Sequence, residues 1–447
     1  MKAKMIFFFL LYSISYTSVG MEKNKPIEKT PTNTKNKKEQ IKQIPKKWVQ
    51  LKKELKNRRS ALTSPIVQRR MQRILRTMSK KDSEKKTIEL IEKLEKIVHN
   101  RLFDLARLYQ LKAQVYLSQD DFKKAGLYYK KALNLKRLSY NEHLSVLYDL
   151  ATINLLQNKI KKASQITDQI FYLADTVPSS AYILKASILV EQKKKKQALK
   201  LVMKAIQSTT QPNESWLAFG AALNLDMEQY IPAARLLIKL TGGYPERKKY
   251  WKQLSAVYLN INKDDRALAT LDLAYKLDFL EKEQEILHLA GLLMYQGLSF
   301  KAANLIEKSL KLKKVKPTKK NQEILGDCWL RAEETKKALA AYHLAAPAAE
   351  DGKIFFKIAR IYMGKQNWKA AVGSLQKALS KGGIKHLENI YISLGIAYVN
   401  LKKHTEAINS FEQVISTEAK GQQIKIARDW INYTKRLMNS TASLYTE

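Results

Sequence analysis

Nine alanines recur along this chain at almost constant spacing, and this period constrains the fold more than any other feature. They stand at Ala125, Ala163, Ala198, Ala233, Ala267, Ala302, Ala338, Ala371 and Ala407. The intervals between them are 38, 35, 35, 34, 35, 36, 33 and 36 residues. Such a period is typical of repeat architectures, in which each unit buries its apolar face against its neighbours. The sequence therefore predicts one elongated array rather than several closed domains.

Other residues keep a fixed offset from each alanine. The clearest copy surrounds Ala267 and contains Trp251, Leu254, Ser255, Tyr258, Leu271 and Ala274. The copies around Ala163 and Ala302 are degenerate, because Asn154 and Leu293 stand where an aromatic residue is expected. Only 15 glycines and 10 prolines interrupt 447 residues rich in helix formers, which favours helical hairpins over strands. A period of about 34 residues with small residues between paired helices is typical of tetratricopeptide repeats.

We therefore predict an all-α protein, a right-handed α-solenoid of about nine tetratricopeptide-like helical hairpins with a C-terminal capping helix. The expected organisation is a signal peptide at 1–20, a basic disordered linker at 21–45, N-terminal helices at 46–100, the repeat array at 101–420, a capping helix at 421–438 and a tail at 439–447. Gly242-Gly243 and Gly382-Gly383 are expected to end helices in left-handed conformations.

The first twenty residues resemble a secretory signal. A basic lead from Met1 to Lys4 precedes an apolar run from Met5 to Tyr12, and small residues surround Ser18. This run is well short of the roughly 20 apolar residues that a membrane-spanning helix needs. We therefore expect an exported protein. Cys328 is the only cysteine and is expected to be a small buried side chain, which excludes an intrachain disulfide.

The charge of this chain is strongly positive, with a formal net of +40. Residues 21–80 carry 19 lysines and arginines against four acidic residues, a net of +15. This segment leaves open weak contact with anionic membranes. Lysines that simply solvate the surface are the simpler interpretation, because the excess follows no single face. No specific nucleic-acid partner is expected, since no nucleic-acid-binding motif accompanies the charge.

No arrangement of residues in the sequence predicts catalysis. The histidines are scattered, without metal-ligand spacing, and are expected to be surface or partly packed residues: His99, His143, His288, His343, His386 and His404. Phosphate-binding loops, nucleophile elbows and zinc-protease helices are lacking in the sequence. We therefore predict a protein that is not an enzyme and needs no cofactor or metal. A hydrolase or transferase assembled across the array ranks last among the alternatives.

The first helix of each hairpin is expected to line an inner groove that binds other proteins. The predicted partner-binding residues are Lys252, Leu259, Asn260, Phe356, Arg360, Met363, Ile392 and Val399. Apolar side chains would grip an extended or helical segment, and basic side chains would select acidic ligands. For Ile392 and its neighbour Ile396, packing between adjacent hairpins is an equally good interpretation.

From about Trp216 onward the chain resembles a more specific family. The segments that carry this resemblance are Lys249–Tyr258, Leu271–Leu280, Phe300–Ala303, Ala378–Ile384 and Arg428–Tyr433. They resemble a family of periplasmic tetratricopeptide proteins that is typically encoded beside TonB, ExbB and ExbD, and the resemblance covers most of Tyr109–Arg436. Ser299 departs from the proline that the family usually has there. The resemblance implies a periplasmic scaffold accessory to TonB-type transport, with inner-membrane TonB-system components as partners.

Two other functions remain compatible with the sequence. A secreted repeat protein that acts on partners outside the cell would carry the same export signal. A charge-driven binder of anionic lipid or nucleic acid would use the basic segment before residue 80. The first would be found in the culture supernatant, and the second would bind polyanions with a steep dependence on salt.

Overall fold

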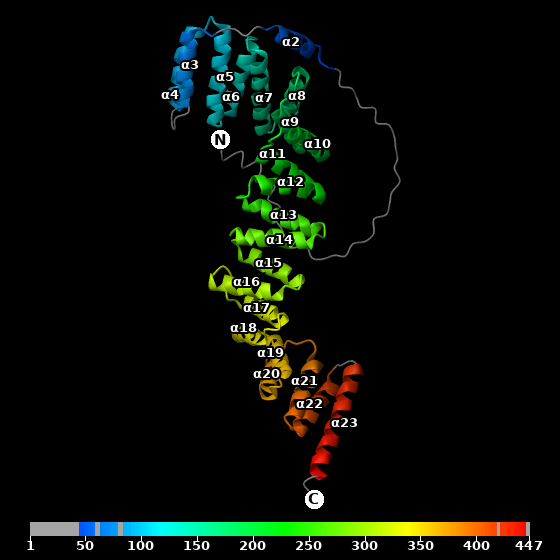
Figure 1. Ribbon diagram of the computed structural model, residues 1–447. Helices are drawn as coiled ribbons and strands as arrows, with labels where there is room; N and C mark the ends of the chain where they lie inside the picture. Colours follow the sequence, from blue (N-terminus) through cyan, green and yellow to red (C-terminus); the bar gives the residue numbers. More distant parts are fainter. Residues whose placement is uncertain (1–43, 59–62, 79–83, 418–420, 444–447) are drawn as a thin grey trace, which may run out of the picture. The chain divides into compact units, whose positions relative to one another are not determined.

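The computed structural model describes residues 44–58, 63–78, 84–417 and 421–443, and helices make up most of this part of the chain (Figure 1). No strand occurs in these residues, which confirms the all-α prediction. The expected signal peptide and most of the expected basic linker lie outside the described residues. The chain divides into two compact units, Met1–Pro245 (unit 1) and Glu246–Glu447 (unit 2).

Unit 1 begins with three helices that lack the repeat pattern, α2 (Lys46–Asn57), α3 (Pro65–Met78) and α4 (Glu84–Val98). Four hairpins follow them, and each consists of two helices in close contact. These hairpins are α5 (Leu102–Ser118) with α6 (Phe122–Asn134), α7 (Tyr140–Leu156) with α8 (Ile160–Leu173), α9 (Ser179–Glu191) with α10 (Lys195–Gln207), and α11 (Glu214–Asp226) with α12 (Tyr230–Gly243).

Unit 2 contains five hairpins and a final single helix. The hairpins are α13 (Lys248–Asn260) with α14 (Asp264–Lys276), α15 (Glu283–Tyr295) with α16 (Ser299–Lys311), α17 (Lys319–Arg331) with α18 (Thr335–Ala345), α19 (Lys353–Gly364) with α20 (Trp368–Lys381), and α21 (Leu387–Asn400) with α22 (His404–Ser416). A short 3₁₀ helix, η1 (Ala346–Ala348), precedes α19. The last helix, α23 (Gly421–Ser443), packs on α22 and continues past the predicted end at residue 438.

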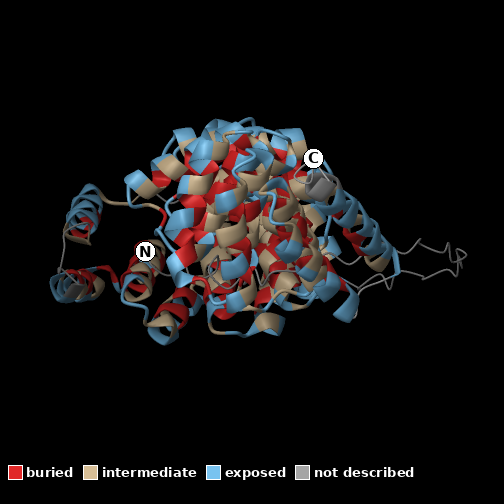
Figure 2. Ribbon diagram, turned by 90° about the horizontal axis from the view of Figure 1, so that it is seen from below, coloured by how far each residue is buried: buried red, intermediate tan, exposed pale blue. Residues whose placement is uncertain are grey.

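The periodic alanines mark the second helix of every hairpin in the described part of the chain. All nine are fully buried, at 0% exposure. A side chain no larger than a methyl group lets the two helices approach, and the large residues of the repeat then fill the space between neighbouring hairpins. Figure 2 shows the buried faces of the helices turned toward one another and the exposed faces toward solvent. The sequence prediction of nine hairpins is therefore confirmed.

One turn geometry joins the two helices of every described hairpin. The residue two positions after the first helix has a positive φ in each case: Asp120, Asn158, Lys193, Glu228, Asn262, Gly297, Glu333, Gln366 and Lys402. The next amide then donates to the carbonyl of the residue five positions earlier, at 2.7–2.9 Å, as in Asp121 to Tyr116 and Lys159 to Asn154. This pair of features is the Schellman motif, which satisfies carbonyls at a helix end.

The Schellman bond explains why repeats that lack the aromatic residue fold like the others. Its acceptor is the backbone carbonyl at the position where most copies carry an aromatic residue. Asn154 and Leu293 supply that carbonyl as well as a tyrosine does, and their partners are the amides of Lys159 and Leu298. The hairpins α7–α8 and α15–α16 therefore form without the aromatic side chain, as do α9–α10 and α11–α12, where Leu189 and Asn224 are the acceptors.

The two predicted glycine pairs behave differently. Gly382 and Gly383 have φ values of +65° and +69°, as expected for a helix end. Gly242 and Gly243 were wrongly predicted to be left-handed, because α12 continues through Gly243 and Tyr244 follows it as the C-cap. The amide of Tyr244 still donates to the carbonyl of Leu240, so the helical hydrogen bonding continues past both glycines.

Candidate partner-binding surface

Ion pairs connect the first helices of neighbouring hairpins in unit 2. Lys252 on α13 lies 2.6 Å from Glu285 on α15, and Lys248 on α13 pairs at 2.5 Å with Glu281, which lies just before α15. The side chain of Asn321 on α17 donates to Glu283 on α15 at 2.8 Å. Both lysine pairs span 33 residues, close to one repeat. The first helices are thus held in register by polar contacts as well as by packing.

Lys357 on α19 extends this series back to α17. Its Nζ lies 2.9 Å from Glu323 and 2.7 Å from Asp327. Burial lowers the pKa of Lys357, but its hydrogen bonds to Asp327 and Glu323 outweigh this effect and raise the pKa above its usual value. Asp327 also accepts a hydrogen bond from the Tyr342 hydroxyl at 2.6 Å. The acidic side chains of α17 are therefore occupied by contacts within the array.

A hollow of about 460 Å³ opens between the first helices of the last two hairpins. The α19–α21 hollow is lined by Phe356, Arg360, Met363, Asn389, Ile392 and Ser393. Three of its residues, Phe356, Arg360 and Met363, are spaced four and three apart and so share one face of α19. Phe356 and Met363 are half-buried against the core, so the hollow has an apolar floor.

Arg360 supplies a positive charge at the edge of this floor. Its side chain is exposed, and no acidic side chain of the described residues pairs with it. The nearby lysine on the same helix, Lys357, is in contrast already paired with α17. An arginine at the rim of an apolar hollow can bind a carboxylate in a bidentate manner. The site can therefore accept an apolar side chain together with a neighbouring acidic group.

The structure brings four of the eight predicted residues together, namely Phe356, Arg360, Met363 and Ile392. The remaining four lie elsewhere. Lys252 is held by Glu285, and the Asn260 side chain donates to the carbonyl of Ala256 on its own helix at 2.8 Å. Leu259 is half-buried on α13, and Val399 packs with Ile392 and Ile396 against the cluster formed by α22 and α23.

Two residues of the hollow, Asn389 and Ser393, are absent from the prediction. Both lie on α21, and Asn389, Ile392, Ser393 and Ile396 form one helical stripe. The Ser393 hydroxyl donates to the carbonyl of Asn389 at 2.7 Å, so the amide of Asn389 is the more available polar group. The helical spacing that indicates Ile392 also indicates these two neighbours on the same face of α21.

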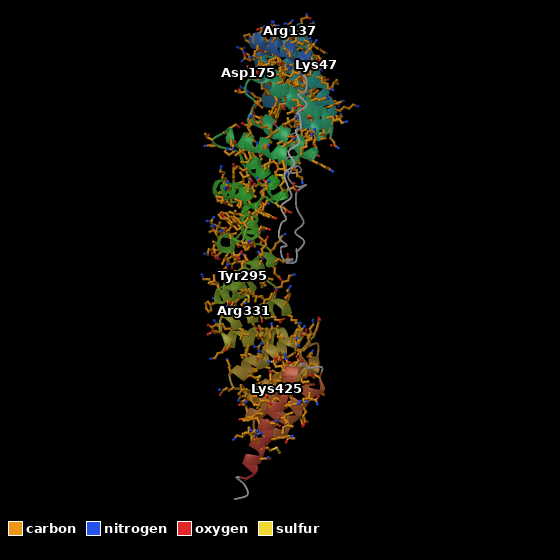
Figure 3. The ribbon with its side chains drawn as sticks, turned by 90° about the vertical axis from the view of Figure 1, so that its right-hand side faces the viewer. Lys47, Arg137, Asp175, Tyr295, Arg331 and Lys425 are labelled. Atoms are coloured by element: carbon orange, nitrogen blue, oxygen red, sulfur yellow. The ribbon has the colours of Figure 1, made fainter. Side chains whose placement is uncertain are left out.

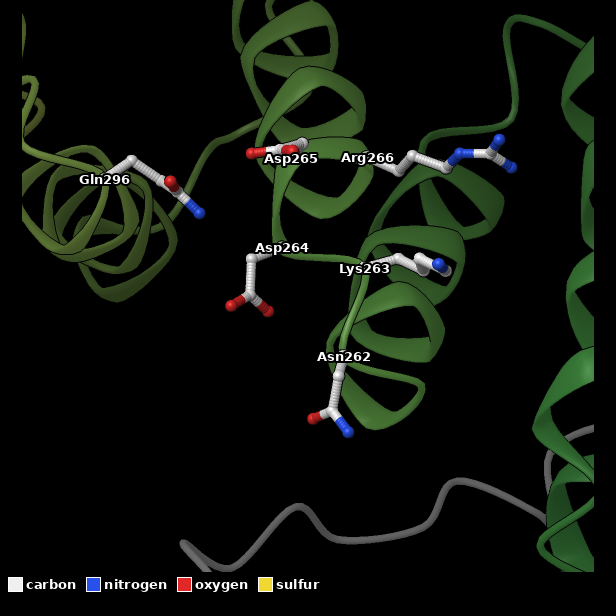
Figure 4. A pocket seen from close by; sticks show the side chains of 6 residues that line it. All are labelled: Asn262, Lys263, Asp264, Asp265, Arg266 and Gln296. Carbon is white, nitrogen blue, oxygen red and sulfur yellow. The ribbon is translucent and has the colours of Figure 1, made fainter.

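Another hollow, of about 550 Å³, lies beside the turn between α13 and α14 (Figure 4). Its lining is polar throughout and consists of Asn262, Lys263, Asp264, Asp265, Arg266 and Gln296. Figure 4 shows Asp264, Asp265 and Gln296 directed into the open space, whereas Lys263 and Arg266 point away. The two aspartates begin α14, where negative charge stabilises a helix N-terminus. This hollow lacks the apolar floor of the α19–α21 hollow.

The reactive residue types are packed rather than assembled into a site. Cys328 is fully buried, as predicted, and burial raises the pKa of its thiol to about 12. No group of histidine, cysteine and acidic residues that could hold a metal occurs in the described residues. His143 differs from the expectation of a surface or partly packed residue, because it is buried and neither ring nitrogen has a hydrogen-bond partner. None of the helices described is long and apolar enough to span a bilayer.

Comparison with known proteins finds a repeat model at two places in the chain. A family model described as tetratricopeptide repeat matches residues 106–137 and 388–420, which correspond to the first and last hairpins. A search of curated protein sequences finds no significant match.

Solved structures of repeat proteins resemble this chain at low identity. The TPR protein YrrB, described as having an unusual peptide-binding site, is 17% identical with a TM-score of 0.36, over 43% of this chain and 95% of YrrB. MamA from Desulfovibrio magneticus RS-1 is 19% identical with a TM-score of 0.32, over 38% of this chain and 97% of MamA. The APC/C hetero-tetramer Cut9–Hcn1 is 15% identical with a TM-score of 0.29, over 80% of this chain and 85% of that chain. Because all three TM-scores are below 0.5, the repeat assignment rests on the hairpins and the family model.

Proposed function

We propose that this array of tetratricopeptide repeats is a non-enzymatic scaffold that binds a segment of another protein in the α19–α21 hollow. The observation that carries this proposal is the pairing of an apolar floor, made by Phe356, Met363 and Ile392, with Arg360. Apolar contacts supply most of the affinity for a peptide, and a fixed charge selects its sequence and orientation. The fitting ligand is a segment with a large apolar residue beside an acidic residue.

The overall charge supports a preference for acidic partners. A formal net charge of +40 creates a positive potential that speeds encounters with negatively charged proteins. The ion pairs from α13 to α15 and from α19 to α17 occupy Glu285, Glu323 and Asp327, so these carboxylates repel an acidic ligand less. The same pairs, together with the buried thiol of Cys328, support a structural rather than a catalytic role for these groups.

At the level of the cell, we propose a periplasmic role as an accessory to TonB–ExbB–ExbD-type transport. The signal-like N-terminus and the resemblance of the chain from Trp216 onward to periplasmic tetratricopeptide proteins support this proposal. The partner in this role would be a protein of the inner-membrane energy-transducing system.

The test is crosslinking in the cell followed by mass spectrometry, with the full-length chain and two variants of equal charge. Phe356→Ala/Arg360→Glu removes both features of the α19–α21 hollow, and Leu344→Ala/Lys336→Glu makes the same kinds of change on α18, where Leu344 is 68% exposed. We expect recovery of TonB-system proteins to fall at least tenfold for the first variant and to remain near wild type for the second. Equal recovery by all three proteins would exclude the hollow as the binding site.

A second function is favoured by the surface of α3. Its exposed residues include Arg69, Arg70, Arg73, Ile66 and Leu75, and α3 contains no acidic residue. A basic helix with exposed apolar side chains is suited to the surface of an anionic membrane. Cosedimentation with vesicles of phosphatidylglycerol and phosphatidylcholine tests this function. Binding that is lost in Arg69→Glu/Arg73→Glu and at high salt would support it, whereas binding that is unchanged by both would exclude α3.

A further inference from the structure

The helix α2 contacts repeats that lie more than eighty residues further along the chain. Leu55 on α2 is 1% exposed and is buried in a cluster with Leu147, Ile170, Leu173 and Ala181. These four residues come from α7, α8 and the start of α9. The half-buried residues around them include Leu51, Leu144 and Tyr148. We call this face of α7, α8 and α9 the α2 groove.

Polar contacts fix α2 at the C-terminal end of α8. Lys52 donates to the backbone carbonyl of Tyr172 at 2.9 Å, and Lys52 and Lys56 lie 3.5 Å and 3.1 Å from Asp175. The Trp48 ring packs against the Tyr172 ring with centroids 6.2 Å apart. Since carbonyls at a helix C-terminus carry partial negative charge, the end of α8 attracts these lysines. Figure 3 shows Asp175 at the same end of unit 1 as Lys47 on α2.

The contact has the form of a helix bound in a groove. The anchors Trp48, Lys52, Leu55 and Lys56 follow the spacing i, i+4, i+7 and i+8, which places them on one face of α2. The helix has 12 residues, and no side chain caps its N-terminus. Helices of this length are marginal in water, so α2 depends on the groove for its structure.

We propose that the α2 groove also accepts the α2 helix of a second copy of this protein, so that two copies exchange α2. The contacts themselves identify the occupant, because they show the groove fitting a Lys-bearing amphipathic helix with these four anchors. Exchange of an identical element uses only contacts that each copy already makes, and it is therefore a low-cost route to a dimer. The proposal is independent of ligand binding at the α19–α21 hollow.

A reciprocal change of charge tests the exchange with two full-length variants. The acidic-helix variant carries Lys52→Glu/Lys56→Glu, and the basic-groove variant carries Asp175→Lys. Within either variant α2 and its own groove repel each other. In a mixture, the unchanged α2 of the second variant fits the unchanged groove of the first, and the acidic α2 of the first is no longer repelled by a carboxylate at position 175 of the second.

Sedimentation velocity distinguishes the outcomes of this mixture. It is expected to show a 1:1 heterodimer when the acidic-helix and basic-groove variants are combined, and monomers when either variant is measured alone. A mixture that remains monomeric would overturn the proposal.

An independent pair of variants tests the apolar anchor. Leu55→Asp leaves the α2 groove vacant, and Tyr172→Ala/Asp175→Lys releases α2 from a damaged groove. A fluorescent peptide of residues 44–58 should bind full-length Leu55→Asp at least tenfold more tightly than it binds wild type, whose groove is filled, or the damaged-groove variant. A peptide carrying the same Leu55→Asp change should not bind. Equal binding of the peptide to all three proteins, or no binding to any of them, would exclude the α2 groove as a binding site for α2.

The two experiments together separate the possible occupants. Peptide binding by Leu55→Asp without a heterodimer in the mixture would show that the α2 groove accepts α2 as a free peptide but not from a second full-length copy, and would contradict exchange between copies. Circular dichroism and the urea unfolding midpoint establish that each variant is folded. The acidic-helix and basic-groove variants change only charged side chains and leave the apolar core intact.

Discussion

Lys112 on α5 lies at the position where other repeats carry Leu254, Ile358 or Leu394, and its Nζ pairs with Glu92 of α4 at 3.3 Å. The lysine is 4% exposed, and a second carboxylate, Glu95, lies 3.5 Å away. Burial lowers the pKa of Lys112, but Tyr128, Glu95 and Glu92 together raise it above its usual value. The first repeat thus has ion pairs with α4 at the position where the other repeats have an apolar side chain.

Removing the carboxylates should cost more than removing the lysine. In Glu92→Gln/Glu95→Gln a buried ammonium loses its charged partners, and we expect a loss of about 1–2 kcal/mol, reduced because the carboxylates are partly exposed. Lys112→Met restores the apolar residue of the other repeats and should be close to neutral. Urea unfolding measures both variants. A larger loss for Lys112→Met than for the double variant would contradict this account.

Replacement of a turn residue that has positive φ by glycine should stabilise the protein. Lys193 has φ of +60° with a side chain that this conformation disfavours, and Lys193→Gly should stabilise unit 1 by about 0.5–1 kcal/mol. Gly297→Ala is the opposite test, because its φ is +74° and an added Cβ would meet no atom within 4 Å. This change should therefore cost about 1 kcal/mol from the backbone alone. Unfolding midpoints that move in the same direction for both variants would refute the argument.

Where the two helices of a hairpin approach closely, replacement of a glycine should destabilise the fold through a steric clash. A Cβ at Gly395 would lie 2.4 Å from the ring of Phe411, which is fully buried and cannot move aside easily. Gly395→Ala should therefore destabilise the last hairpin by about 1–3 kcal/mol. Gly291→Ala on α15 serves as the control, because it meets nothing within 4 Å and should be stabilising by up to about 1 kcal/mol. Hydrogen exchange of α21 and α22 would locate the effect.

Acid should weaken unit 1 through His143. Burial, together with the charge of Arg58, lowers the pKa of His143 to about 4. Because the unfolded chain has a pKa near 6.5, the stabilising contribution is complete above about pH 6.5 and is lost as the pH falls toward 4. His143→Leu should remove this dependence and flatten the melting temperature between pH 7 and 4.5. An unchanged slope in that variant would assign the acid sensitivity to other groups.

The sequence predicted the repeat architecture because the evidence is local and repeated. A small residue at Ala125 or Ala407 is required by helix contact in every hairpin, so one pattern recurs nine times in the described part of the chain. The turn conformations could not be predicted in this way, because Lys193 and Glu228 adopt a backbone state that their side chains do not favour.

The candidate site was predictable only where a single helix determines it. Phe356, Arg360 and Met363 share a face of α19 by spacing alone, and the structure places them together. Lys252 has the same helical register on α13, but Glu285, 33 residues later, occupies its ammonium. The contact of α2 with Tyr172 spans 120 residues without any repeat relation, so no local pattern indicates it.

The turn residues give this fold an unusual freedom of composition. The Schellman motif requires of each turn only a backbone conformation and a carbonyl acceptor. The nine described positions with positive φ are occupied by aspartate, asparagine, lysine, glutamate, glutamine and glycine. The edge of the array formed by these turns can consequently change its charge from one repeat to the next while the hairpins stay intact. Substitution of these turn residues, or attachment of a fluorophore to them, should therefore leave the buried contacts between helices unchanged.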